Sequence, residues 1–272
     1  MGINVLVVGG LGNQLFTIFT GIAYFLEHKV PFKLVSCEKR RPFYYGSFLS
    51  NLKRFVTEES WQLRSIKSYV EPNFHYDKIP YNDNFILKGY WQSHKYFKDQ
   101  LDNILRLTGI GVKKSEIKNK YPDYKDNSVS IHFRIGDYIS YPEHHNILNV
   151  GYYINALNKL LDEDNSIKDV IIFGEKCDDK TILDRMNILK ERFNQLNFQV
   201  IDHNIVDYEQ MLIMSNCKYN IIANSSFSLM AAYLNLDEEK KVFYPSEWFG
   251  SANKDKDTKD IPEDKGWFRV DI

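Results

Sequence analysis

The strongest constraint on the fold is a regular alternation of short apolar segments and longer amphipathic segments in the second half of the chain. Short apolar runs bounded by polar residues predict buried strands, and apolar residues at helical spacing predict helices between them. Strands that alternate with helices imply a parallel sheet with right-handed crossovers. We predict strands at 128–133, 170–173, 198–201, 219–223 and 242–244, and helices at 152–161, 180–196, 208–215 and 227–236.

The first half of the chain shows a similar arrangement less clearly, with an irregular stretch rich in Tyr, Phe and Pro from residue 36 to residue 84. The segment 121–127 is polar and contains a proline, so it is the candidate linker between two α/β domains, at 1–125 and 126–272. The elements that we predict before it are strands at 3–8, 32–35 and 85–87, a glycine-rich loop at 9–12, and helices at 13–27, 58–67 and 99–107.

Composition excludes several classes of protein. A formal charge of −1 argues against a nucleic-acid-binding protein, which usually has a strongly basic face, and the mixed charge along the chain indicates no partner. Cys37, Cys177 and Cys217 are far apart and form no C-x-x-C pair, so we expect no disulfide scaffold and no structural zinc. No charged leader precedes the first strand, and no apolar run approaches the roughly 20 residues that span a bilayer. We therefore expect a cytoplasmic protein without a membrane span.

The strand at 128–133 ends in an unusual group of polar residues, His132, Arg134, Gly136 and Asp137. Open α/β sheets bind ligands just outside the carboxyl ends of their strands. An arginine at such an end can place a planar, always-charged fork on a phosphate. The alternative interpretation is a surface ion pair between Arg134 and Asp137, with Gly136 as a simple turn residue.

The pattern H-x-R-x-G-D-Y at 132–138 resembles the signature of the α-1,2-fucosyltransferases (glycosyltransferase family 11) and, more loosely, that of the α-1,6 and protein O-fucosyltransferases. Further segments match the α-1,2 family in the same order, so the resemblance runs nearly end to end. These segments are GGLGNQLF at 9–16, GYWQS at 89–93 with Tyr96-Phe97, IIANSSFS at 221–228, PSEWF at 245–249 and DIP at 260–262.

The resemblance implies a GT-B-like α/β fold, in which two Rossmann-like domains face each other across a cleft, the first on the acceptor side and the second on the donor side. It implies an inverting, metal-independent transfer of L-fucose from GDP-fucose to a hydroxyl of a glycan acceptor, with O2 of a terminal galactose as the first candidate. The donor is a substrate, so no cofactor is expected. The alternatives are the same fold with another nucleotide sugar, an NAD-dependent oxidoreductase, or a catalytically silent carbohydrate-binding relative.

Two segments are the candidates for binding the donor diphosphate. Arg134 is the first. The second is the turn from the strand at 219–223 into the next helix, because a helix N-terminus offers free backbone N–H groups and partial positive charge. The alternative for this turn is an ordinary N-cap serine. The turn consists of Asn224, Ser225, Ser226 and Phe227.

The glycine-rich loop also invites a dinucleotide-binding interpretation, because it follows a strand and opens a helix. Leu15 stands where that fingerprint needs its third glycine, although Glu38 could act as the ribose-binding acid. The resemblance instead implies that the loop backbone approaches the cleft and that an amide side chain bonds to donor or acceptor. A helix-start turn with a polar cap is the structural alternative. The residues concerned are Gly10, Gly12, Asn13 and Gln14.

Other polar and aromatic residues have weaker assignments. Strand alternation turns His132 away from Ile131, so it could lie beside the nucleotide. Asp137 is the candidate base for the acceptor hydroxyl, and Glu175 is its rival. Aromatic faces suit sugars, although core packing explains the tryptophan equally well. The candidate acceptor residues are Trp91, His94 and Tyr96.

Two further features concern metal and base recognition. The D-x-D sequences at 162–164 and 255–257 could hold a metal on the diphosphate, but neither follows an apolar strand, so we interpret both as solvated and expect no metal site. Gln210 stands where the family commonly has an Asp that is implied to grip guanine. A carboxylate accepts from both guanine N–H groups, whereas an amide offers one acceptor and one donor. The hypothesis is that base selection is relaxed, or moved to Asp207 or Glu209.

Overall fold

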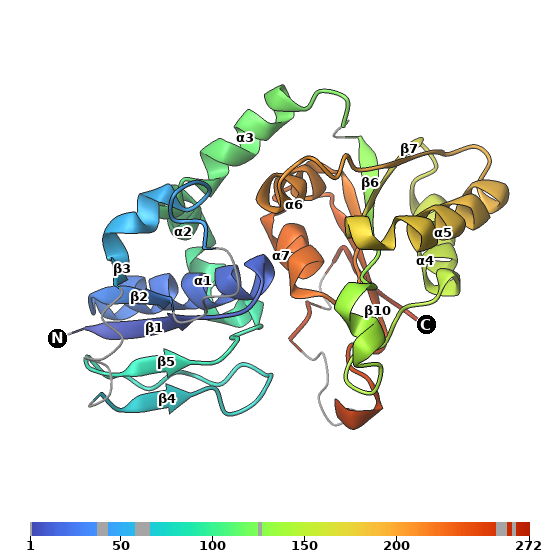
Figure 1. Ribbon diagram of the computed structural model, residues 1–272. Coiled ribbons are helices and arrows are strands. Elements are labelled where there is room, and N and C mark those ends of the chain that lie inside the picture. The colour runs from blue at the N-terminus through green and yellow to red at the C-terminus, as the bar shows by residue number, and fades with distance from the viewer. Residues whose placement is uncertain (1, 37–42, 58–65, 125–126, 254–259, 263–264) are drawn as a thin grey trace. The chain divides into compact units, whose positions relative to one another are not determined.

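The computed structural model of the protein describes residues 2–36, 43–57, 66–124, 127–253, 260–262 and 265–272 (Figure 1). Contacts divide the chain into a first unit, residues 1–115 with 259–261, and a second unit, residues 116–258 with 262–272. The division falls before the predicted linker at 121–127. Each unit contains a fully parallel sheet with helices, so the predicted fold class of two Rossmann-like α/β units is confirmed.

The first unit has a five-stranded sheet in the order β3-β2-β1-β5-β4. The order in which strands are added to the sheet reverses between β1 and β5, which pair directly and in parallel. Helix α1 (Leu11–His28) covers the sheet so closely that a Cβ on Gly21 would lie 2.5 Å from the Val5 side chain. The strands are β1 (Ile3–Val7), β2 (Phe32–Ser36), β3 (Val56–Thr57), β4 (Ser68–Val70) and β5 (Ile86–Lys88).

Short helical segments complete the first unit. One of them precedes β3, and the others follow β5 and end in a longer helix that continues into the second unit. The segments are η1 (Ser50–Phe55), η3 (His94–Tyr96), η4 (Lys98–Gln100), α2 (Leu101–Thr108) and α3 (Ile110–Lys120).

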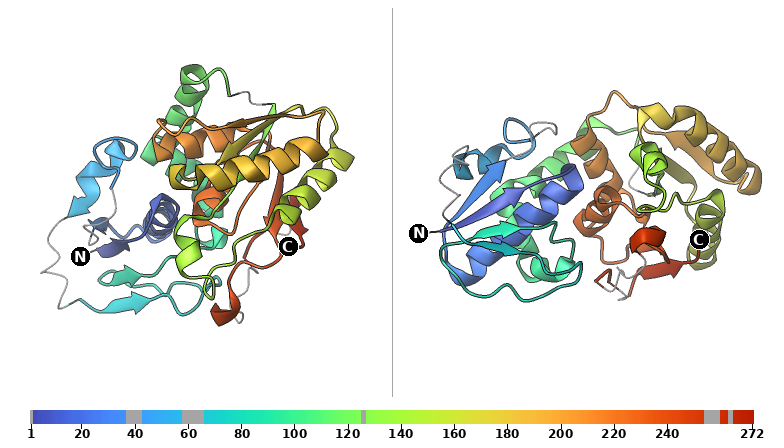
Figure 2. Two further views of the ribbon diagram at one scale, coloured as in Figure 1. Left: turned by 45° about the vertical axis from the view of Figure 1, so that its right-hand side comes forward. Right: turned by 60° about the horizontal axis from the view of Figure 1, so that its bottom comes forward.

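The second unit has a six-stranded sheet in the order β11-β10-β9-β6-β7-β8. Numbered within the unit this is the doubly wound order, in which the strand order reverses between β6 and β9 and a ligand crevice forms at that switch point. Helices α4 and α5 lie on one face of the sheet and α6 and α7 on the other (Figures 1 and 2). The strands are β6 (Ser128–His132), β7 (Asp169–Phe173), β8 (Asn197–Val200), β9 (Tyr219–Ile221), β10 (Lys241–Pro245) and β11 (Trp267–Val270), and the helices are α4 (Val150–Glu163), α5 (Asp179–Arg192), α6 (Asp207–Asn216) and α7 (Ser226–Leu234).

The central strand β6 is buried on both faces, which differ in chemistry. Val129, Ile131 and the following Phe133 belong to the apolar core that includes α4 and α5 residues. On the opposite face, the Ser130 hydroxyl accepts a hydrogen bond from the buried Asn220 amide of β9 at 2.8 Å. His132 lies on this second face, with its ring 5.6 Å from that of Phe227, as strand alternation predicted.

Several elements differ from the prediction. The strands β3, β4 and β11 and the helix α3 were not predicted, whereas the other strands and helices lie within a few residues of their predicted positions. Most of the predicted helix at 58–67 and the whole sequence 255–257 fall outside the described residues, as does Glu38. No described helix has the length and apolar character needed to cross a bilayer.

Candidate active site

Both donor-binding segments predicted from the sequence follow the two strands at the switch point of the second unit. Arg134 is the second residue after β6, and Asn224 is the third residue after β9. The two strands pair in parallel, with Ile131 opposite Ile221. Their carboxyl ends therefore meet at one edge of the sheet, where doubly wound sheets bind ligands.

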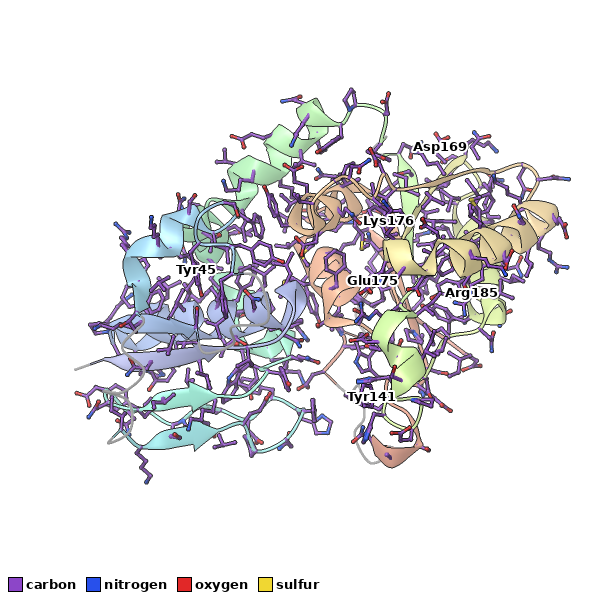
Figure 3. All side chains as sticks on the ribbon, viewed as in Figure 1. Tyr45, Tyr141, Asp169, Glu175, Lys176 and Arg185 are labelled. Atoms are coloured by element: carbon purple, nitrogen blue, oxygen red, sulfur yellow. The ribbon has the colours of Figure 1, made fainter. Side chains whose placement is uncertain are left out.

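Arg134 is held by two carboxylates and an aromatic ring. Its guanidinium donates to Asp137 and to Glu175, and it lies 5.1 Å above the ring centre of Tyr138. Glu175 follows β7, at the turn that leads into α5 (Figure 3). Burial opposes the charge of Arg134, but the two carboxylates outweigh it and raise its pKa. The ion pair with Asp137, which was the alternative interpretation of this motif, therefore exists, and Glu175 extends it into a cluster.

The surroundings of Gly136 explain why the motif has a glycine at this position. Its backbone has a φ of +24°, and a Cβ there would lie 2.7 Å from Oε2 of Glu175. Its N–H donates to the Asp178 carboxylate at 2.8 Å. The residue is thus a site of close approach between the loop after β6 and the loop after β7.

Tyr138 joins the two predicted segments, and the sequence interpretation gave it no role although it ends the H-x-R-x-G-D-Y pattern. Its hydroxyl donates to the backbone carbonyl of Asn224 at 2.9 Å, while its ring lies beneath Arg134. The ring of Tyr138 also stacks on His145, with ring centres 4.2 Å apart. Arg134 and the turn that begins α7 are therefore connected through one tyrosine.

The turn after β9 uses some of its polar atoms for structure. The Asn224 amide donates to the carbonyls of Asn146 and Trp248, each at 2.9 Å. The Ser225 hydroxyl accepts from the Phe227 N–H at 3.3 Å, so Ser225 is the N-cap of α7. Oδ1 of Asn224 is buried without a hydrogen-bond partner among the described residues. The capping alternative thus holds for Ser225, and the free N–H groups at the start of α7 stay available to an anion.

His132 is neutral at physiological pH. Its side chain is almost fully buried, and burial together with the charge of Arg134 lowers its pKa to about 3. Nδ1 has no hydrogen-bond partner among the described residues. A neutral imidazole next to Arg134 can bind as a hydrogen-bond donor or acceptor but does not add charge to the site.

The candidate guanine-reading residues lie at the start of α6. The Gln210 amide donates to the Ile205 carbonyl at 2.7 Å. Glu209 is buried and accepts from Lys120 and from the Tyr121 hydroxyl. Both carboxylate oxygens of Glu209 bind other residues, so recognition of the base by Glu209 would compete with these bonds and stays a prediction.

We predicted that the carboxylates at 162–164 are solvated, but two of them, Glu163 and Asp164, form ion pairs. Asp164 accepts from Lys218 and from the Tyr219 hydroxyl, and Glu163 accepts from Lys241. Tyr219 begins β9, so this group lies at the amino edge of the sheet, opposite the edge that holds Arg134. A second group of possible metal ligands is formed by Glu175, Cys177 and Asp178. One carboxylate oxygen of each acid and Sγ of the cysteine lie within 4.8 Å of one another. Arg134 binds one of these three side chains, Glu175.

In the first unit, the glycine-rich loop connects the carboxyl end of β1 to the start of α1. Gly9 has a φ of +78°. The Gln14 amide donates to the Gly9 carbonyl at 2.9 Å, and Oδ1 of Asn13 accepts from the Gln92 amide at 2.8 Å. Gly10 is the N-cap position of α1, with no side-chain cap and open space where a Cβ would lie, and Gly12 is buried in the first turn of α1. Two of the matching sequence segments therefore meet at this edge of the first unit.

The three predicted acceptor residues have different surroundings. Trp91 is fully buried and stacks on Tyr69, so the core-packing interpretation describes it. His94 bonds through Nδ1 to the Asp260 carbonyl at 2.7 Å. Tyr96 is partly exposed, and its ring centre lies 4.9 Å from that of Tyr76. Of the three, Tyr96 lines a cavity.

Comparisons with known proteins agree with the sequence motifs. The chain is 28% identical to O-antigen biosynthesis glycosyltransferase WbnK of Escherichia coli, over 93% of this chain and 96% of that protein. It is 27% identical to an alpha-1,2-colitosyltransferase of E. coli, over 89% of this chain and 91% of that protein. Its fold resembles that of E. coli heptosyltransferase II, with a TM-score of 0.51 at 13% identity over 99% of this chain and 90% of that chain.

The sequence model of one family, described as glycosyl transferase family 11, matches residues 47–267. That range includes the arginine motif after β6 and the capped turn before α7. The chain belongs to glycosyl transferase family 11.

Proposed function

We propose that the protein transfers L-fucose from GDP-fucose to a hydroxyl group of a glycan acceptor, with O2 of a terminal galactose as the first candidate. The observation that carries the proposal is the position of Arg134 at the switch point, joined through Tyr138 to the start of α7. Membership of a glycosyltransferase family replaces the NAD-dependent oxidoreductase alternative. A colitose donor is the second candidate, because one relative is named a colitosyltransferase.

Departure of a diphosphate requires positive charge where negative charge develops. Arg134 offers a bidentate fork, and the N-terminus of α7 offers backbone N–H groups. In the free protein the fork is shared between Asp137 and Glu175. An arriving diphosphate competes with these carboxylates, so binding weakens at least one of the two ion pairs. No metal has a part in this proposal.

The carboxylate released from Arg134 is then the candidate base. A carboxylate that no longer binds a cation has its oxygens free to accept the proton of the attacking hydroxyl. The acceptor oxygen bonds to C1 of the sugar, the bond from C1 to the phosphate oxygen breaks, and the carboxylate takes the hydroxyl proton. Asp137 is the first candidate and Glu175 the second. Asp137→Asn should lower kcat about 100-fold or more, while Glu175→Gln should act mainly on KM for the donor.

The direct experiment incubates the protein with GDP-fucose, a galactose-ended acceptor and EDTA, and detects the product by mass. GDP at 100 times its Kd should add about 2.7 kcal/mol of stability in a thermal-shift series. Arg134→Ala should abolish this gain, and Arg134→Lys should keep part of it, because charge remains but the fork is lost. Arg192→Ala, at the exposed end of α5, is the matched control. Unchanged GDP binding by Arg134→Ala, or transfer only with added metal, would contradict the proposal.

A further inference from the structure

Tyr138 packs against a histidine as well as against Arg134. The rings of Tyr138 and His145 are nearly parallel, with 13° between their planes and 4.2 Å between their centres. The Arg134 guanidinium lies 5.1 Å above the centre of the same tyrosine ring. Both contacts depend on the position of one ring, so a group that fixes the Tyr138 ring also fixes the surface against which Arg134 lies.

His145 belongs to the loop that connects η5 (Gly136–Ser140) to α4. The backbone before it is bound to the segment that follows β10, because the His144 carbonyl accepts from the Gly250 N–H at 2.9 Å. A Cβ on Gly250 would lie 2.6 Å from the Glu143 carbonyl oxygen, so the two segments approach as closely as a glycine allows. The main chain that carries His145 is therefore held in place.

The residue after His145 binds the turn that begins α7. The Asn146 carbonyl accepts from the Asn224 amide at 2.9 Å, and the Asn146 amide donates to the Phe249 carbonyl at 2.9 Å. The loop therefore contacts both predicted donor-binding segments, one through the stacked rings and the other through this carbonyl. Phe249 ends the matching sequence segment at 245–249, which thereby has a structural part in the site.

The His145 ring stacks as a neutral group. Burial lowers the pKa of His145, and the charge of Arg134 acts in the same direction, against the opposite effect of Asp137. The imidazole is therefore uncharged at pH 7 and does not repel the guanidinium. Since only an aromatic face is used in the stack, a phenylalanine ring can take the place of the imidazole.

The aromatic contact matters most when the donor is bound. In the free protein Arg134 donates to Asp137 and Glu175, and an arriving diphosphate competes for the same N–H groups. Contact with an aromatic ring uses the face of the guanidinium and leaves its N–H groups to the phosphate. The Tyr138 ring is thus the support that Arg134 keeps while the carboxylates are displaced.

We propose that His145 is a positioning residue, which keeps the Tyr138 ring beneath Arg134 so that the guanidinium meets the donor diphosphate in one orientation. It acts through Tyr138 rather than on the substrate. This inference rests on the proposed function, in which Arg134 binds the diphosphate of the donor.

The test measures the Kd of GDP by isothermal titration, and the KM for donor and acceptor, with the full-length protein and its variants. His145→Ala should raise the Kd and the donor KM about three- to ten-fold, as expected for the loss of one aromatic pair. The acceptor KM should stay unchanged. His145→Phe should restore most of the loss, whereas a role in folding alone would lower the unfolding temperature and leave the Kd of GDP unchanged.

His144→Ala is the matched control, since His144 is the adjacent histidine and its side chain is 49% exposed. Its Nδ1 lies 3.2 Å from the Asn253 amide nitrogen, and its loss should leave the Kd unchanged. A double-mutant cycle tests the path, because His145→Ala should have little further effect after Tyr138→Leu. An unchanged Kd in His145→Ala, or its full effect without the Tyr138 ring, would overturn the positioning role.

If the native protein does not bind GDP, the proposed function fails, and inorganic pyrophosphate replaces GDP in the same comparison. Weaker pyrophosphate binding by His145→Ala, recovered in His145→Phe, then supports the positioning role. Equal binding by the native protein and both variants, or no binding by any of them, overturns it.

Discussion

Gly136 lies where any side chain would displace Glu175 from Arg134. A Cβ would meet Oε2 of Glu175 at 2.7 Å, and the φ of +24° is unfavourable for residues other than glycine. Glu175 cannot move aside freely, because Arg134 holds its other oxygen. A single hydrogen atom in place of a methyl group therefore sets the geometry of the arginine cluster.

We expect Gly136→Ala to lower the free energy of unfolding by about 1–3 kcal/mol and to weaken GDP binding as well. Chemical denaturation and a GDP thermal-shift series measure the two effects. Gly46→Ala is the control, because Gly46 is exposed and a Cβ added to it would meet no atom within 4 Å. An Ala at 136 that left both quantities unchanged would show that Glu175 is loosely held.

Lys240 is a second residue for which the structure predicts a measurable effect, the pH dependence of stability. Its ammonium donates to the carbonyls of Ala232 and Asn235 at the end of α7, and burial lowers its pKa to about 8. Between pH 8 and the ordinary pKa near 10.4, the unfolded chain binds more protons than the folded one. Stability from this group therefore rises with pH in that window and is constant below it.

The prediction for Lys240 compares the native protein with Lys240→Met by urea unfolding at pH 7.5, 8.5 and 9.5. Between pH 7.5 and 9.5 the difference in unfolding free energy should shift in favour of the native protein by about 2 kcal/mol. The comparison removes the contribution of tyrosines that titrate in the same range. A difference that is flat with pH would mean that Lys240 keeps an ordinary pKa.

At the scale of elements, the start of α7 combines a structural cap with a candidate anion site. Ser225→Ala should cost about 1 kcal/mol of stability, as is usual for a lost N-cap. Asn149 caps α4 in the same way, accepting from the Tyr152 N–H at 3.2 Å, so Asn149→Ala is a matched control. We expect both variants to lose similar stability but only Ser225→Ala to lose part of the GDP-induced gain. Equal gains in both would leave Ser225 as a cap alone.

The elements that the sequence predicted are those with enough buried residues to show a period. Helix α1 and strands β6 and β7 have long apolar patterns, and their positions agree with the structure. Strand β3 has two residues and β4 has three, too short for any alternation to be visible. Helix α3 is mostly polar, with Ile110 and Ile117 as its buried apolar residues, so its helical spacing is nearly hidden.

The candidate site was predictable where a motif followed a strand. Arg134 and the turn at Asn224 could be placed at one edge of a parallel sheet, because strand order and chain direction decide that. The link through Tyr138 was not predictable, since it depends on which way one side chain turns after β6. The pairing of Glu209 with Lys120 likewise joins residues far apart in sequence and gives no local pattern.

At the scale of the whole molecule, the two units carry opposite net charge. Residues 1–115 contain sixteen Lys and Arg against nine Asp and Glu, whereas residues 116–272 contain nineteen against twenty-seven. The sequence interpretation counted charge over the whole chain and found it balanced. Counted by unit, the net charges differ strongly, and this asymmetry indicates that the basic first unit favours anionic surfaces.

We expect the protein to bind a cation exchanger at pH 7 and low ionic strength, although its overall charge is slightly negative. The exposed pair Lys53 and Arg54 belongs to the basic unit, so reversing both to Glu should lower the salt needed for elution. Reversing Lys190 and Arg192, exposed on α5 of the acidic unit, changes net charge equally and should have a smaller effect. Equal effects would mean that only total charge matters.

Asp260 comes late in the chain, yet its side chain bonds to Lys95 of the first unit. The residues that follow it include β11, which belongs to the second unit. Neither unit is therefore a continuous stretch of polypeptide. A chimera that exchanges one unit between relatives needs three junctions, near residues 115, 258 and 261. A single junction near residue 115 would instead leave the first unit with residues 259–261 of the other relative, and so with a foreign Asp260 opposite its own Lys95.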